Sequence, residues 1–214
     1  MDRSRATFLA HTQKAFKRHR CGVVGLLGLL LVLCALIFGA GPASASVVEA
    51  LSLVELVKRS EHVVVATAGE RMGRRSGNLI VTDVQLTIAE GLKGGAKRGD
   101  TLVATLLGGV AEGVGLQVPG EAALPEGGQL VVFLRRTPES KELRIVGMAQ
   151  GVMPIATRSG KSMVQPPSHD AELMKRGADG HLQKGESAVA TEIALPDLLT
   201  RIRSLVASLA QPAR

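Results

Sequence analysis

Ser168, His169 and Asp170 are the three residue types of a hydrolytic triad, and they stand next to one another in the chain. A nucleophile, a base and an orienting carboxylate normally come from separated positions, because three consecutive side chains do not readily converge on one reacting atom. The sequence also lacks the GxSxG, HExxH and Walker-loop motifs. It therefore predicts a polar loop at this point and no catalytic residue.

The segment 168–181 offers a second kind of chemistry, because its imidazoles and carboxylates are ligands that divalent metals accept. The candidate ligands are His169, Asp170, Glu172, Asp179 and His181. Their spacing matches no closed metal site, and the prolines and glycines around them favour a solvated loop. The loop is the preferred interpretation, and no cofactor is predicted. A metal-dependent or hydrolytic enzyme that uses 168–181 is the alternative.

Residues 108–128 form the segment in which we most expect a contact surface. They hold seven glycines in 21 residues and no Lys or Arg, so the cation of a phosphate site is missing. A loop of this length in a compact domain is functional or unstructured. A structural loop that covers a sheet edge is the alternative. Nearby, Arg71, Arg74 and Arg75 are expected to be solvated, and His62 to be a strand-end residue rather than a base.

Residues 1–45 have the order of a secretory leader. Residues 1–20 hold six Lys or Arg against one Asp, a net charge of +5, and an uncharged apolar run follows at 21–40. A Gly-Pro breaker and an Ala-Ser-Ala site then predict cleavage between Ala45 and Ser46. Because an apolar helix of this length, about 30 Å, also spans a bilayer, an uncleaved membrane anchor is the alternative.

The composition of 46–214 excludes several classes of protein. The whole chain carries +7, but 46–214 holds 20 Lys or Arg against 18 Asp or Glu, so its own charge is only +2. That balance does not indicate a nucleic-acid partner. Cys21 and Cys34 both lie in the leader, which excludes disulfides and thiolate chemistry from the body. Phe133 is the only aromatic residue in the body, so no stacking platform for bases or sugars is expected.

Hydrophobic patterning predicts that 46–214 is a single, mainly β domain with a helix near each end. A capping box, Ser52-Leu53-Val54-Glu55, opens a short helix. Apolar residues at i, i+3, i+4 and i+7 between Leu195 and Leu209 predict an amphipathic C-terminal helix. Strands are expected at 62–72, 79–90, 101–107, 129–136, 142–148, 152–157 and 162–165.

The expected fold is therefore a small antiparallel barrel or open sheet of about six strands, with an OB-like barrel as one form. The remaining polar segment, 166–188, is dotted with proline and glycine and is expected to be a mobile loop.

Three motifs in the body resemble those of uncharacterised exported proteins from myxobacteria and related bacteria. Residues 87–94 (TIAEGLKG) are similar to their "VLKG" turn, 113–134 (GVGLQVPGEAALPEGGQLVVFL) to their "VPGE" loop and "GE-x-V-x-x-FL" strand, and 146–151 (VGMAQG) to their "G-x-AQG" hairpin. Gly128-Gln129 stands where Gly-Glu is usual. The resemblance covers about residues 60–155 and implies a β fold and an envelope address. Its motifs carry no catalytic residue.

The order of a strand followed by an "LKG" turn also resembles netrin-like inhibitor modules, which have an OB barrel. Those modules depend on cysteines near the mature N-terminus, and 46–214 contains none. The inhibitory function is therefore not carried over.

Taken together, the sequence predicts an exported, non-enzymatic binding module of the bacterial envelope, periplasmic or extracellular. Its partner is an unknown protein or envelope component, and no nucleic acid is expected to bind. Contact with the membrane is expected only through the leader, which if uncleaved would make a single-pass protein anchored in the inner membrane.

Overall fold

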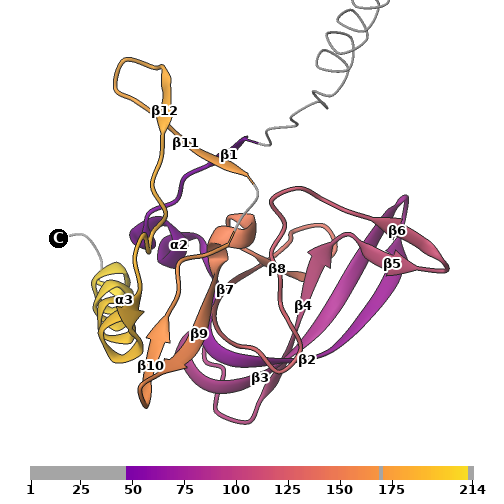
Figure 1. The fold of residues 1–214 in the computed structure, drawn as a ribbon, viewed down its shortest axis with the longest axis horizontal. Helices are drawn as coiled ribbons and strands as arrows, with labels where there is room; N and C mark the ends of the chain where they lie inside the picture. The colour runs from indigo at the N-terminus through magenta and orange to yellow at the C-terminus, as the bar shows by residue number, and fades with distance from the viewer. Residues whose placement is uncertain (1–46, 169–170, 212–214) are drawn as a thin grey trace, which may run out of the picture. The chain divides into compact units, whose positions relative to one another are not determined.

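The chain folds into a β body with a helix near each end, as its hydrophobic patterning predicts. The computed structural model describes residues 47–168 and 171–211, which belong to the compact unit Ala45–Arg214. Helix α2 (Leu53–Arg59) precedes the main strands and α3 (Leu195–Ala210) follows them. Figure 1 shows both helices on one side of the body and the short strands β5 and β6 on the opposite side.

Three long strands form an antiparallel meander at the centre of the fold. They are β2 (His62–Ser76), β3 (Leu79–Lys93) and β4 (Thr101–Leu107). β3 alternates between apolar and polar residues, and its apolar Val84, Leu86 and Ile88 are all buried. A strand with this period turns one face to a core and the other to solvent.

Two further strands close the meander into a ring. β7 (Gln129–Arg136) pairs antiparallel with β2, and β8 (Leu143–Ile145) lies between β7 and β4. β7 beside β2 gives the spatial order of a Greek key, and the five-stranded ring is the plan of an OB-like barrel. The contact between β4 and β8 is parallel, at Ala104 and Leu143, so the ring is not purely antiparallel.

Three strands extend the sheet beyond this ring. The edge of β7 that pairs with β8 at Leu134–Arg136 pairs with β9 (Val152–Arg158) at Leu130–Val132. β10 (Lys161–Val164) continues from β9 as a hairpin, and β13 (Ile193–Ala194) completes the edge. β7 therefore belongs both to the barrel and to the open part of the sheet.

The shared strands β2 and β7 separate two hydrophobic cores. The inner core fills the barrel and includes Val64, Ala66, Val132 and Leu134. The outer core lies under α2 and α3 and includes Phe133 from β7. Alternate residues of β7 and of the first part of β2, residues 63–66, thus enter opposite cores, which explains why these stretches are continuous apolar runs.

Both helices cover the outer core. α2 has the predicted capping box, in which Ser52 and Glu55 bond each other's backbone N–H groups. α3 buries Leu198, Leu199 and Ile202, as predicted, whereas Leu209 is exposed. Leu205 and Val206, one turn further along, are half-buried against the same core, so only the last turn of α3, with Leu209, extends beyond it.

The prediction of about six strands was too low, because the structure has many short strands that have no apolar run of their own. All seven expected strands are present, although 142–148 forms only β8 followed by the 3-10 helix η1 (Met148–Gly151). The additional short strands are β1 (Val47–Glu49), β5 (Gly109–Ala111), β6 (Val114–Leu116), β11 (Glu172–Arg176), β12 (Leu182–Lys184) and β13. Strands of two to five residues are set by their long-range partners rather than by local pattern.

The segment 166–188, which was expected to be a mobile loop, contains two short strands, β11 and β12. β11 pairs in parallel with β1 and antiparallel with β12, which makes a separate three-stranded sheet. Leu173 of β11 is buried while its neighbour Glu172 is exposed. The partner strand β1 lies far away in the sequence, so no local pattern in this polar segment indicates the pairing.

Candidate functional site

The glycine-rich segment 108–128 lies at the mouth of the barrel. Its first part is the hairpin formed by β5 and β6, in which Val110 pairs with Gly115. β5 crosses β2 at Gly73, where a Cβ atom would overlap the carbonyl oxygen of Val110. Glycine is therefore required at this point of β2, because any side chain would push the hairpin away from the sheet.

The middle of the segment, Val118-Pro119-Gly120-Glu121, closes the seam between β4 and η1. The Glu121 carboxylate accepts hydrogen bonds from the backbone N–H groups of Leu107 (2.9 Å) and Ala122 (2.9 Å). On the other side, the carbonyl of Gly120 accepts a bond from the N–H of Ala149 (3.1 Å). Gly120 has φ +79°, and a Cβ there would press on Ala171 at 3.1 Å, so this turn also needs glycine.

The last part of the segment plugs the barrel. Ala122 and Leu124 belong to the inner core, and Leu124 is fully buried. The N–H of Gly127 donates to the carbonyl of Ala68 (2.7 Å), and the N–H of Ala68 donates to Gly128 (2.9 Å). The segment is therefore anchored at both ends, and the part between the hairpin and the plug forms the rim of an opening.

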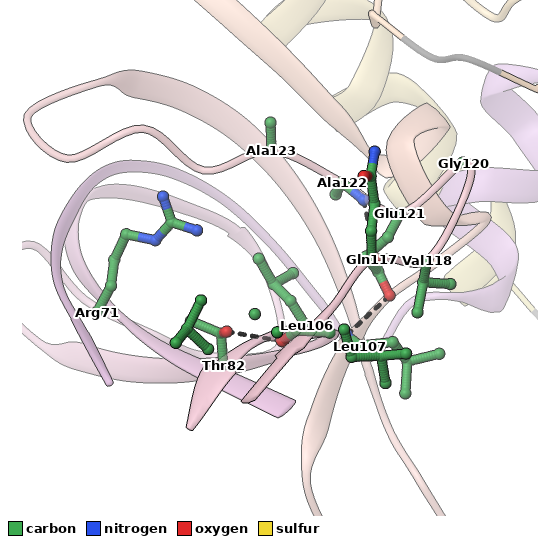
Figure 2. A pocket seen from close by; sticks show the side chains of 15 residues that line it. Arg71, Thr82, Leu106, Leu107, Gln117, Val118, Gly120, Glu121, Ala122 and Ala123 are labelled. Carbon is green, nitrogen blue, oxygen red and sulfur yellow. Dashed lines mark hydrogen bonds between the residues drawn. The ribbon is translucent and has the colours of Figure 1, made fainter. Parts of the chain in front are cut away.

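That opening is a cavity of about 710 Å³ at the barrel mouth. Figure 2 shows Arg71 on one side and Glu121 on the other, with Thr82 and Leu106 between them. The cavity is lined by Arg71, Thr82, Leu106, Leu107, Gly108, Gly109, Val110, Gly115, Leu116, Gln117, Val118, Gly120, Glu121, Ala122 and Ala123. Thr82 of β3 and Leu106 of β4 form its floor, and the glycine-rich segment forms its rim. Ligand sites in barrel mouths are often built in this way.

Arg71 reaches this cavity because of an irregularity in β2. The register of β2 against β3 shifts between Ala68 and Arg71, which places Arg71 opposite Val84. Val84 belongs to the inner core, so Arg71 lies on the inner face where the barrel opens. Its side chain is exposed, and no acidic side chain among the described residues pairs with it.

The prediction that Arg71, Arg74 and Arg75 are all merely solvated was wrong for two of them. Arg75 Nε donates to Glu112 (2.7 Å) at the tip of the β5–β6 hairpin. Arg74 forms ion pairs on the outer face, as described next. Of the three cations, only Arg71 is left to face the cavity without an acidic partner in the described part of the chain.

Arg74 is the centre of an ionic network on the outer face of β3 and β4. It donates to Asp83 (2.6 Å) and to Glu142 (2.7 Å), and Arg144 donates to Glu142 (2.9 Å). The hydrogen bond from Arg74, opposed by burial and supported by Arg144, lowers the pKa of Glu142 from 4.5 to about 2. Burial raises the pKa of Asp83, but bonds from Arg74 and Thr105 outweigh it and leave that pKa lowered.

The same partners explain why this network is structural rather than catalytic. Two carboxylates share Arg74, whose pKa is raised chiefly by the hydrogen bond to Asp83. A second cavity of about 390 Å³ lies beside the network. The pKa values of Asp83 and Glu142 are both lowered, and both carboxylates are hydrogen-bonded to arginine. Neither is therefore suited to exchange a proton near neutral pH.

Two motifs of the resemblance have structural roles. Gln150 of the "AQG" motif is 1% exposed, and its amide accepts a bond from Leu51 N–H (2.9 Å) and donates to the carbonyls of Glu49 (2.9 Å) and Gly147 (3.2 Å). Lys93 of the "LKG" motif donates to the carbonyls of Val57 (2.7 Å) and Ser60 (2.6 Å).

These contacts tie distant parts of the chain together. Gln150 holds the segment after β1 against η1, and Lys93 satisfies carbonyls at the C-terminal end of α2, where a cation is favoured. His62 opens β2, as predicted, and its Nδ1 is buried without a hydrogen-bond partner in the described structure.

The candidate metal ligands are only partly described. His169 and Asp170 lie outside the described residues. Asp179 and His181 share a turn, in which the Asp179 carboxylate accepts a bond from the N–H of His181 (3.1 Å), and Glu172 is exposed on β11. Within 47–168 and 171–211, no three His, Cys, Asp or Glu side chains are grouped as metal ligands would be. The metal hypothesis stays a prediction.

The leader and its cleavage site, Ala45 and Ser46, also lie outside the described residues. Neither α2 nor α3, nor any other described helix, has the length and apolar character needed to cross a membrane. Comparison of the chain with protein-family models, with curated proteins and with solved structures finds no match.

Proposed function

We propose that the protein is an exported, non-enzymatic binding module of the bacterial envelope and that its partner binds at the mouth of the barrel. The observation that carries this proposal is the cavity of about 710 Å³. The cavity is open to solvent rather than enclosed, and barrel mouths are among the places where ligand sites occur.

The construction of the cavity supports binding as its use. Its floor comes from β3 and β4, through Thr82 and Leu106, and is held by the barrel core. Its rim is anchored by Glu121, whose carboxylate is already bonded to two backbone N–H groups. A site with a rigid floor and a fixed rim is preorganised, which reduces the cost of ordering on binding.

The proposal of export rests on the leader, with +5 at 1–20 ahead of the apolar run at 21–40. A fusion of residues 1–60 to a reporter that is active only outside the cytoplasm tests it. We expect an active fusion. An inactive fusion that stays in the cytoplasm would contradict export and, with it, the proposed location in the envelope.

Capture of partners from an envelope extract tests the binding site. Residues 45–214, the compact unit that contains both cores, serve as bait in three forms: wild type, Arg71→Glu and Arg201→Glu. Arg201 is exposed on α3, on the opposite side from the hairpin, so its variant carries the same charge change away from the cavity. We expect proteins that the wild type and Arg201→Glu retain and Arg71→Glu loses. The same proteins on all three baits would place binding elsewhere.

A further inference from the structure

We infer that the barrel mouth takes an extended peptide, which adds as a strand to the free edge of β6 and places an acidic side chain against Arg71. This inference rests on the proposed function and names the class of partner. It combines three features: a cavity with a cation that has no acidic partner among the described residues, the free edge of a strand that lines this cavity, and an exposed apolar side chain on that strand.

The first support is the edge of β6. β5 and β6 form a sheet of only two strands, and β5 packs on β2 at Gly73. The other edge of β6 has no strand beside it in the described structure, while Gly115, Leu116 and the following Gln117 line the cavity. A free edge offers backbone N–H and C=O groups to an incoming chain, which is the basis of strand addition. Gly115 has no side chain to obstruct that approach.

The second support is the charge of the cavity. Arg71 is exposed and has no acidic partner among the described residues. The opposite charge in the cavity, Glu121, is half-buried and already accepts bonds from two N–H groups. Arg71 is therefore the charged group that is free to bind, and a carboxylate is a group that a guanidinium binds well, through paired hydrogen bonds.

The third support favours a peptide over a small carboxylate. Val114, on β6 itself, is 48% exposed. A β-branched side chain on the edge strand of a short two-stranded ribbon gains from a further strand that packs beside it. A small carboxylate would reach Arg71 but would leave Val114 and the edge of β6 uncovered.

A set of fluorescein-labelled hexapeptides tests the inference by fluorescence anisotropy with residues 45–214. The peptides alternate Val and Thr, and a single Asp moves through the positions of the set. We expect at least one peptide to bind. Its Asp→Asn version should bind about tenfold more weakly, because a charged acceptor on Arg71 is lost. Arg71→Glu should weaken binding of the Asp peptide at least as much and should favour the same peptide with Lys in place of Asp.

Two N-methylated versions of the best peptide test strand addition. Alternate N–H groups of a strand point to opposite edges, so methylation of one set should abolish binding and methylation of the other should preserve it. Arg201→Glu is the matched control and should leave all affinities unchanged. Hexanoate, which offers a carboxylate without a backbone, should displace the peptide only weakly.

The inference is overturned if no peptide binds, if both N-methylated versions bind equally, or if Arg71→Glu leaves the affinity unchanged. Strong Arg71-dependent binding of hexanoate together with equal binding of both methylated peptides would assign a small-carboxylate site instead. The extract capture separates the two proposals. If Arg71→Glu still loses the captured proteins while the peptides fail, only the peptide assignment falls. If that capture also shows no dependence on Arg71, both fall.

Discussion

Gln150 is the buried polar side chain that joins the N-terminal segment to the barrel. It provides partners for the Leu51 N–H and the Glu49 carbonyl, about a hundred residues away in sequence. Because a buried backbone group without a partner costs free energy, Gln150→Ala should lower the free energy of unfolding by about 1–3 kcal/mol. Gln129→Ala, at an exposed position of β7, should change it by less than about 0.5 kcal/mol. Urea unfolding of both variants measures the difference. Equal midpoints would show that the hydrogen bonds of the Gln150 side chain do not contribute to stability.

Glu142 should make the stability of the protein depend on acid pH. Its pKa in the folded protein, about 2, is below its ordinary 4.5 because Arg74 and Arg144 donate to it. Since the folded-state pKa is lowered, its stabilisation is complete above about pH 4.5 and is lost as the pH falls through about 2.

Replacement of Glu142 by Gln tests this dependence. Glu142→Gln should cost about 1–3 kcal/mol at neutral pH, because the two arginines lose a charged acceptor. It should also flatten the decline of stability between pH 4.5 and 2, whereas Glu139→Gln, at an exposed neighbour, should keep the wild-type decline. Urea midpoints across that range are the measurement. Parallel curves for the wild type and Glu142→Gln would refute a role for this carboxylate in the acid response.

At the scale of elements, the C-terminal helix owes its order to the outer core. Ile202 of α3 is fully buried, while Arg201 beside it is exposed. Ile202→Ala should therefore cost about 2–5 kcal/mol, and Arg201→Ala less than about 0.5 kcal/mol. Denaturant midpoints test the pair. If both substitutions are equally mild, α3 is not docked in solution.

The position of the β5–β6 hairpin should depend on Gly73. Gly73→Ala would place a methyl group against the carbonyl of Val110 and should cost about 1–3 kcal/mol as the hairpin is displaced. Gly69→Ala, in the same strand, meets nothing closer than 3.6 Å and should be neutral or slightly stabilising, because alanine loses less backbone entropy on folding. Unfolding midpoints decide between them. A neutral Gly73→Ala would mean that the hairpin does not rest on β2.

The same elements show how far the sequence predicts this fold. β3 and α3 alternate or repeat strongly and were placed correctly, because each buries one face of its own residues. β11 was missed because its partner, β1, lies more than a hundred residues away and its own residues are mostly polar.

The contact surface expected at 108–128 coincides with the rim of the cavity, but the position of Arg71 at this cavity could not be predicted. In the folded chain Arg74 pairs with Asp83 and Arg75 pairs with Glu112, which leaves Arg71 without an acidic partner among the described residues. The sequence alone does not indicate which of the three arginines is left.

At the scale of the whole molecule, the two cores lie between the helices at one side of the body and the proposed binding site at the other. Both helices cover the outer core, and the β5–β6 hairpin lies on the opposite side of the body (Figure 1). β2 extends from one side to the other: its first residues are buried between the two cores, and Arg71 and Met72 further along are exposed. The barrel therefore holds the cavity floor rigidly, while the rim is made of glycine-rich backbone that a partner can approach closely.

Site-specific photo-crosslinking in living cells tests binding at the barrel mouth most directly. The photoreactive residue p-benzoylphenylalanine replaces either Gln117, which is exposed at the cavity, or Ser208, which is exposed on the outer face of α3. Binding at the mouth predicts a defined crosslinked product for the Gln117 variant that Arg71→Glu abolishes, and none for the Ser208 variant. A product that forms equally from both positions, or that survives Arg71→Glu, would contradict it.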